Sequence, residues 1–287
     1  MLTRIITAAV LLPLVVVGVL KLPAVPFVAI SAALLILASW EWARLAGWES
    51  ILMRLVYVLG FVLIVAAVIH PLATAWLTLI LYHLSLLFWP LILILVLTYP
   101  NTAPYWGKSR LLRSVMGYLT LATCFFILVK FGSAQFPREM LLLCLVLIWG
   151  ADSGAYFAGK RWGKTPLIPS VSPGKTVAGL VGALITGLFI VVLVFALSES
   201  ILACTHGACK LAFLNFGSAS ESLLMLMILA LWTILASVLG DLTLSMLKRN
   251  VGVKDTGSLL PGHGGILDRI DSMLPALPIF IHFALFN

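Results

Sequence analysis

The 287-residue chain is 62% hydrophobic and only 10% charged, and its formal net charge is +8. Soluble globular chains carry about 25% charged residues, so this composition excludes a soluble domain. Alternating ten-residue strands typical of a membrane β-barrel are absent, and the sequence therefore predicts an all-α polytopic membrane protein.

Long apolar segments recur along the whole chain and predict nine transmembrane helices. They span residues 5–20, 24–45, 52–69, 74–98, 112–132, 139–159, 177–198, 222–247 and 271–286. The first segment follows Arg4 and resembles a signal peptide, but no small-x-small cleavage site follows it, so we expect it to be retained. The fourth contains His83 and is either one tilted helix or a broken one.

The distribution of cations predicts the orientation of these helices. With nine spans and a cytoplasmic N-terminus, fourteen of the eighteen Lys and Arg residues fall in cytoplasmic segments. This excess agrees with the positive-inside rule, and a basic inner face also suits anionic lipid. The net charge therefore reports topology, and nothing in the sequence indicates nucleic acid binding.

Polar residues divide the chain into two predicted regions. Residues 1–110 form N-terminal transmembrane helices. Residues 111–287 form a second transmembrane region with cytoplasmic loops 160–176 and 248–270, and every aspartate of the chain lies in this second region. Because no soluble domain lies between the spans, any site must lie at the membrane interface or between helices.

The four cysteines fall into two pairs. Cys124 and Cys144 lie inside spans and are interpreted as packing residues. Cys204 and Cys209 flank His206 in a predicted outside loop, where a disulfide is plausible. A metal site there is less favoured, because two thiols and one His leave the usual four ligands incomplete.

The first of two polar clusters covers residues 148–176 and contains Asp152, which lies within an apolar segment. Gly150 and Gly154 form a small-xxx-small pair that would let a neighbouring helix approach closely. Asp152 itself is either a buried, hydrogen-bonded acid or a functional group. Because an ionisable group inside a span costs about 2.5–3.5 kcal/mol on insertion scales, a functional role is the default interpretation.

The motif SPGKT at 172–176 invites comparison with a phosphate-binding P-loop. The required first glycine is replaced by Pro169, so the Walker pattern fails. Ser172, Lys175 and Thr176 are nevertheless donors suited to phosphate, and Gly174 allows close backbone approach. The alternative is a basic loop that only fixes topology.

The second acidic cluster begins near the end of the eighth segment. Asp241, Ser245 and Lys248 are spaced i, i+4, i+7 and share one helix face. Asp268 and Asp271 are spaced i, i+3 at the start of the last helix, where acids also favour the helix dipole. Three carboxylates from two helices form a natural Mg²⁺ site, and the dipole alone does not explain them together with the Gly-His-Gly-Gly turn at 262–265.

The run SMLKRNVGVKDTGSLLPGHGGILDRID at 245–271 closely resembles the signature of the phosphatidate cytidylyltransferases, the CDP-diacylglycerol synthases. The resemblance extends to GADSGAYFAGK at 150–160 and to SPGKT at 172–176, and it is weak before residue 110. It implies a Mg²⁺-dependent reaction in which CTP and phosphatidate give CDP-diacylglycerol and pyrophosphate. It also implies an integral protein of the bacterial inner membrane, with its site on the cytoplasmic side.

The resemblance implies roles for the polar residues of both clusters. Asp241, Asp268 and Asp271 would hold one metal ion or two. Cations expected to neutralise phosphates are Lys248, Arg249, Lys254, His263 and Arg269. Residues expected to bind substrate are Asp152, Ser172, Lys175, Thr176, Ser245, Gly264 and Gly265, and Asp152 would orient a ligand or complete the metal site. A homodimer is common among such enzymes.

Three positions depart from the family pattern, Val177, Ala178 and Leu244, and they keep a degenerate or altered-specificity paralogue open as an alternative. A membrane transporter with an ion site is a second alternative, although the inverted repeats typical of transporters are not found. A CDP-alcohol phosphotransferase is disfavoured, because no aspartate of this chain is followed directly by glycine.

Overall fold

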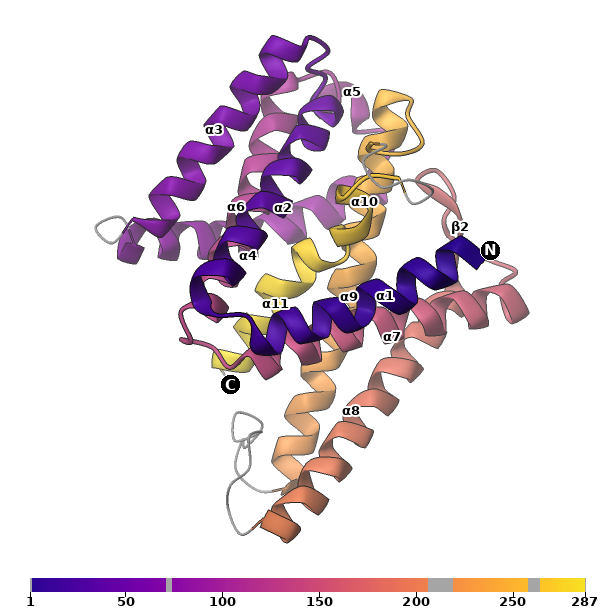
Figure 1. Ribbon diagram of the computed structural model, residues 1–287. Coiled ribbons are helices and arrows are strands. Elements are labelled where there is room, and N and C mark those ends of the chain that lie inside the picture. Colours follow the sequence, from indigo (N-terminus) through magenta and orange to yellow (C-terminus); the bar gives the residue numbers. More distant parts are fainter. Residues whose placement is uncertain (1, 71–73, 206–218, 258–263, 287) are drawn as a thin grey trace.

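The computed structural model describes residues 2–70, 74–205, 219–257 and 264–286. Figure 1 shows helices arranged around a central bundle, with one small hairpin of strands at the upper right. The N-terminal helices are α1 (Leu2–Lys21), α2 (Ala24–Leu45), α3 (Ile51–Ile69), α4 (Thr74–Thr98), α5 (Ala103–Trp106) and α6 (Arg110–Gly132). The remaining helices are α7 (Arg138–Trp162), α8 (Val177–Thr205), α9 (Ala219–Val251), α10 (Leu267–Ile270) and α11 (Met273–Phe286).

Every one of the nine predicted apolar segments coincides with a helix. Over the described part of the chain, seven of these helices are long and apolar enough to cross a membrane. Helix α11 has only 14 residues, and the apolar described part of α1 covers Leu12–Lys21. The fourth segment forms one helix that contains Pro90, not a broken one. The structure therefore supports a polytopic all-α membrane protein, while the count of nine spans and the cytoplasmic N-terminus stay predictions.

Hydrogen bonds tie alternate loops together at one end of the bundle. Asn250, at the end of α9, donates from Nδ2 to the carbonyl of Gly107, 2.8 Å away. Ser170, between the two strands, donates from Oγ to the carbonyl of Tyr99 over 2.9 Å. The loops that follow α4, α7 and α9 are thus on one side, as an antiparallel succession of spans requires.

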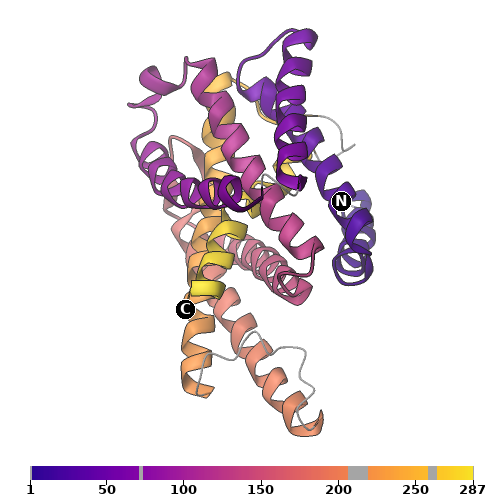
Figure 2. The same ribbon diagram turned by 90° about the vertical axis from the view of Figure 1, so that its left-hand side faces the viewer.

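Close packing of α7 on α8 depends on small residues, as the sequence predicted. A Cβ added at Gly154 would lie 2.7 Å from the carbonyl oxygen of Gly182 and would also overlap the Thr186 hydroxyl. Farther along α8, a Cβ at Gly187 would overlap Ile234 of α9. Figures 1 and 2 show α8 and α9 running side by side beyond the rest of the molecule.

The hydrophobic core surrounds α6. Leu121, Phe125 and Phe131 of this helix are completely buried. Cys124 and Cys144 are buried free thiols, which confirms their interpretation as packing residues. The predicted disulfide between Cys204 and Cys209 lies outside the residues whose side chains the structure describes.

The predicted polar loop 160–176 contains a short antiparallel hairpin, a departure from a purely helical chain. Strand β1 covers Pro166–Ile168 and strand β2 covers Ser172–Thr176, with Ile168 opposite Ser172. Thr176 accepts a hydrogen bond from the backbone N–H of Gly179 at 3.1 Å, and it therefore caps the start of α8. The SPGKT motif is thus an extended strand that ends at a helix N-terminus.

Candidate active site

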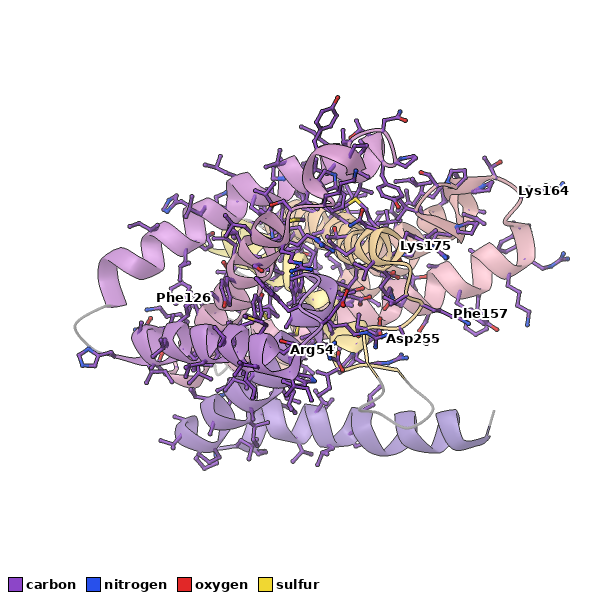
Figure 3. The ribbon with its side chains drawn as sticks, turned by 90° about the horizontal axis from the view of Figure 1, so that it is seen from above. Arg54, Phe126, Phe157, Lys164, Lys175 and Asp255 are labelled. Atoms are coloured by element: carbon purple, nitrogen blue, oxygen red, sulfur yellow. The ribbon has the colours of Figure 1, made fainter. Side chains whose placement is uncertain are left out.

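The hairpin, the loop end of α9 and the segment around α10 meet at one place. Lys175 of β2 and Asp241 of α9 form an ion pair, with 2.6 Å between Nζ and Oδ2. Ser245, one turn along α9, donates to Oδ1 of Asp241 over 3.2 Å. Seen from above in Figure 3, Lys175 lies inward and Lys164 lies at the periphery of the molecule. The structure therefore brings together the two clusters that the sequence singled out.

Two further carboxylates lie close to this ion pair. Asp152 on α7 and Asp271 between α10 and α11 are each near enough to Asp241 and Lys175 for their charges to interact. Asp152 is exposed, whereas Asp271 is partly buried and accepts a hydrogen bond from the N–H of Ser272 at 2.7 Å. The charges of three acidic side chains from three elements thus interact with that of a single lysine.

The Asp268 carboxylate accepts more of the described hydrogen bonds than that of any other aspartate. Its Oδ1 accepts from Lys248 Nζ at 2.8 Å, and its Oδ2 accepts from the backbone N–H groups of Thr256 and Gly265 and from the Thr256 hydroxyl at 2.9–3.1 Å. Burial alone would raise the pKa of the Asp268 carboxyl, but these hydrogen bonds and the Lys248 charge outweigh it and lower the pKa. Asp268 is therefore held as a carboxylate.

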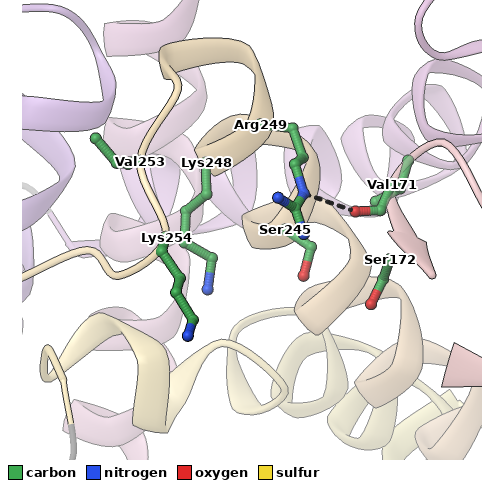
Figure 4. A pocket seen from close by; sticks show the side chains of 7 residues that line it. All are labelled: Val171, Ser172, Ser245, Lys248, Arg249, Val253 and Lys254. Atoms are coloured by element: carbon green, nitrogen blue, oxygen red, sulfur yellow. Dashed lines mark hydrogen bonds between the residues drawn. The ribbon is translucent and has the colours of Figure 1, made fainter. Parts of the chain in front are cut away.

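A cationic pocket of about 110 Å³ lies beside the two ion pairs. It is lined by Val171, Ser172, Ser245, Lys248, Arg249, Val253 and Lys254 (Figure 4). Arg249 is anchored on the hairpin, because its Nε donates to the carbonyl of Val171 at 3.4 Å. The pocket is smaller than the roughly 300–1,000 Å³ of typical ligand sites. Its charge and size therefore fit one phosphate group of a larger substrate.

The last two glycines of the Gly-His-Gly-Gly sequence, Gly264 and Gly265, are glycine for different reasons. Gly264 has a φ of +80°, a conformation that side-chain-bearing residues rarely adopt. Gly265 is buried, and a Cβ there would overlap the Thr256 hydroxyl and the Glu41 carboxylate. Both positions therefore serve loop geometry, and their predicted role in substrate binding stays a prediction.

The other predicted site residues lie in different surroundings or outside the described residues. Arg269 is exposed, and His263 lies outside the described residues. Thr176 caps α8 through its hydroxyl oxygen, which leaves its hydrogen available to a ligand. Leu244, a departure from the family pattern, is 1% exposed and packs in the core instead of facing the site.

Sequence reasoning missed Glu41 of α2. Its carboxylate accepts hydrogen bonds from the backbone N–H groups of Ile266 and Leu267, at 3.0 and 2.8 Å. The available signal was an acid inside an otherwise apolar segment, but Glu41 lies more than 200 positions before its partners, a pairing that spacing alone cannot predict.

The donor set agrees with a hard, oxygen-seeking cation. Within the described ranges, no three acidic, His or Cys residues lie close enough to enclose a metal ion unaided. Mg²⁺ typically keeps waters and substrate phosphates and takes only one or two protein carboxylates. Asp241 and Asp271 offer such oxygens from two elements, and Oδ1 of Asp268 accepts one bond among the described contacts, from Lys248. The residues therefore fit Mg²⁺, and the predicted metal site stays a prediction.

Comparison with known proteins points in one direction. The model of the cytidylyltransferase family matches residues 2–286. A phosphatidate cytidylyltransferase of Pseudomonas aeruginosa is 40% identical over 277 residues, which cover 96% of this chain and 94% of the relative. One from Haemophilus influenzae is 33% identical over 308 residues, covering 99% of this chain and 98% of the relative.

A third relative matches a smaller share of the chain. The phosphatidate cytidylyltransferase of Bacillus subtilis is 34% identical over 184 residues, which cover 62% of this chain and 61% of that protein. The two matches that cover nearly the whole chain extend the similarity into the N-terminal helices, where the motif resemblance was weak.

Proposed function

The chain belongs to the cytidylyltransferase family, and from that premise we propose that the loop end of α9 is its active site. The protein makes CDP-diacylglycerol from phosphatidate and CTP, the activity for which its full-length relatives are named. One observation supports the location: a phosphate-sized cationic pocket lies directly beside the acidic residues of the family signature.

The reaction needs little acid–base chemistry. An oxygen of the phosphatidate phosphate, already anionic, forms a bond to the α-phosphorus of CTP. The bond from that phosphorus to the oxygen bridging to the β-phosphorus breaks, and its electron pair leaves with pyrophosphate. The enzyme must therefore hold two polyanions in line and stabilise charge on the leaving group.

Residues of the pocket are suited to the phosphates. Figure 4 shows the ends of Lys248 and Lys254 pointing the same way, with Arg249 and the hydroxyls of Ser172 and Ser245 nearby. Charge-assisted hydrogen bonds from such groups are roughly twice as strong as neutral ones. We assign these side chains to the CTP phosphates or to the lipid phosphate, which share this chemistry.

Asp241, Asp268 and Asp271 are the residues that would hold Mg²⁺, with Asp152 close enough to complete the site or orient a ligand. When bound, the ion would neutralise charge developing on the pyrophosphate oxygens. In the structure, Lys175 partly neutralises Asp241. Lys175 lies on the hairpin, and we propose that it moves from Asp241 to a substrate phosphate. Substrate binding would then free the Asp241 carboxylate from its ion pair.

The proposed site suits chemistry at a membrane surface. Phosphatidate is a membrane lipid, and the site lies at the loop end of long apolar helices. We propose the cytoplasmic face of a bacterial inner membrane as the location, because the basic loops cluster there under the positive-inside rule. A homodimer, which the resemblance suggests, stays a prediction.

The test is an assay of the purified protein in detergent with labelled CTP and phosphatidate. Lipid-linked CMP that forms with Mg²⁺ and disappears with EDTA is the expected result. Asp268→Ala is expected to abolish product, and Glu49→Gln, at an exposed acid remote from the described contacts of the site, is the matched control. No lipid-linked CMP from folded wild-type protein would contradict the proposal.

A further inference from the structure

Glu41 is a buried acid that the proposed reaction does not use. It lies near the end of α2 and is only 2% exposed. Among the described residues, no ion pair reaches its carboxylate, so hydrogen bonds must compensate for its burial. Its partners are instead backbone and hydroxyl groups of the segment that leads into the active site.

Hydrogen bonds join Glu41 to both sides of that segment. On the α10 side, Oε1 accepts from Ile266 N and Oε2 accepts from Leu267 N, at 3.0 and 2.8 Å. On the α9 side, Oε2 accepts from the Thr256 hydroxyl at 3.0 Å. One carboxylate therefore fixes two stretches of backbone about ten residues apart.

Two glycines shape the space that the carboxylate fills. A Cβ at Gly257 would lie 2.8 Å from Cδ of Glu41, and one at Gly265 would lie 2.7 Å from the same atom. Gly257 and Gly265 belong to the two stretches that Glu41 joins. The absence of side chains there is thus what allows the backbone to close around the Glu41 carboxylate.

Thr256 links Glu41 directly to an active-site residue. Its Oγ1 lies 3.0 Å from Oε2 of Glu41 and 2.9 Å from Oδ2 of Asp268. A hydroxyl has one hydrogen, so it donates fully to only one carboxylate at a time. The positions of the two carboxylates are therefore coupled through one side chain.

We propose that Glu41 is a positioning residue for cytidylyl transfer: it holds the backbone that presents Asp268, and through Asp268 it sets the position of Lys248. The proposal rests on the proposed function, because the positioned groups are those assigned to phosphate and metal. The proposal gives α2, a helix of the N-terminal region, a role in a reaction whose other assigned residues lie in the C-terminal region.

The principal variant is Glu41→Gln, which keeps the size of the side chain but directs an amide toward backbone donors. We expect kcat to fall about 10- to 100-fold, because misplacing catalytic groups by about 1 Å costs this order. The KM for CTP is expected to change far less. Glu49→Gln, the exposed acid eight positions farther along, is the control and should leave kcat unchanged.

A double-mutant cycle separates positioning from general stability. Thr256→Val removes the shared hydroxyl and is expected to lower kcat less than Glu41→Gln does. Because the two residues share the Thr256 hydroxyl contact, the loss of kcat in the double variant should be smaller than the product of the two single losses. Glu41→Asp, which keeps the charge on a shorter side chain, should recover part of the lost kcat.

Several outcomes would overturn the proposal. Glu41 would be purely structural if the wild type is active and Glu41→Gln has a kcat within twofold of it. The same conclusion would follow if Glu41→Gln lowers the unfolding temperature and leaves kcat unchanged. Losses of kcat that multiply in the double variant would contradict the coupling of Glu41 to Asp268 through Thr256. If Glu41→Gln does not fold, an unchanged kcat in Thr256→Val would contradict the proposal instead. Wild-type protein that forms no lipid-linked CMP would refute the proposed function, and this proposal with it.

Discussion

Two lysine–aspartate pairs lie in one site, yet they are built differently. The side chains of Lys248 and Asp268 are 17% and 11% exposed, and Asp268 accepts three further hydrogen bonds. The side chains of Lys175 and Asp241 are 26% and 36% exposed, and Asp241 accepts one further described bond, from Ser245. Enclosed pairs are costly to break, whereas open pairs contribute little to stability. We conclude that the first pair organises the loop and the second is open to ligands.

The largest expected effect follows from changing the open pair. Asp241→Asn should reduce the rate of CDP-diacylglycerol formation about 10²–10³-fold, the usual cost of removing one electrostatic contributor at a reacting centre. The unfolding temperature should hardly change, because the pair is partly solvated. Turnover and thermal unfolding would be measured on the same preparation.

The control for this variant is Asp255→Asn, at an exposed acid of the neighbouring loop. It should retain nearly full activity. A rate for Asp241→Asn that matches Asp255→Asn would remove Asp241 from the site.

The enclosed pair should behave in the opposite way in a stability measurement. Asp268→Asn leaves Lys248 without its counter-charge and weakens several charge-assisted hydrogen bonds. We expect a loss of about 2 kcal/mol in unfolding free energy, within the range for hydrogen bonds to charged groups, together with loss of activity. An unchanged unfolding midpoint in denaturant would show that the pair does not organise the loop.

A smaller effect is expected at Lys175. Lys175→Gln should raise the KM for CTP about tenfold, because one charge-assisted phosphate contact is worth about 1.5–3 kcal/mol. Stability should stay near that of the wild type. Steady-state kinetics over a range of CTP concentrations would check this, and a lowered kcat with unchanged KM would argue against a role for Lys175 in CTP binding.

The smallest effect is a pH dependence of stability. Asp268 lies in α10, outside the seven membrane-spanning helices, and its pKa is lowered in the folded protein. Its contribution is therefore complete above the unfolded pKa of about 3.9 and is lost as the pH falls below that value. The stability difference between wild type and Asp268→Asn should be constant above about pH 5 and should narrow below about pH 4. A stability difference that narrows between pH 8 and 6 would contradict the lowered pKa of Asp268.

Most of the fold could be predicted from hydropathy. Each predicted segment corresponds to a helix, because a lipid-exposed chain must satisfy its backbone hydrogen bonds internally. The small-residue contact of α7 was also predictable, although its partner α8 was not. The β1–β2 hairpin was missed, because Pro166–Ile168 and Ser172–Thr176 are too short to show a strand period.

The sequence indicated which residues to consider for the site, but it did not indicate which of them contact one another. Asp241, Ser245 and Lys248 do share one face of α9, as their spacing indicated. The pairing of Lys175 with Asp241, and of Lys248 with Asp268, depends on how distant elements meet. The contact from Glu41 to Leu267 N depends on packing across most of the chain, for which one sequence carries no signal.

The most direct measurement compares CTP labelled at the α-phosphorus with CTP labelled at the γ-phosphorus, each incubated with the purified protein, phosphatidate and Mg²⁺. Attack at the α-phosphorus predicts that the α label enters the lipid fraction and that the γ label appears in pyrophosphate, in equal amounts. The γ label in the lipid would mean phosphoryl transfer instead, and neither label in the lipid would mean that this cluster of aspartates and lysines does not catalyse cytidylyl transfer.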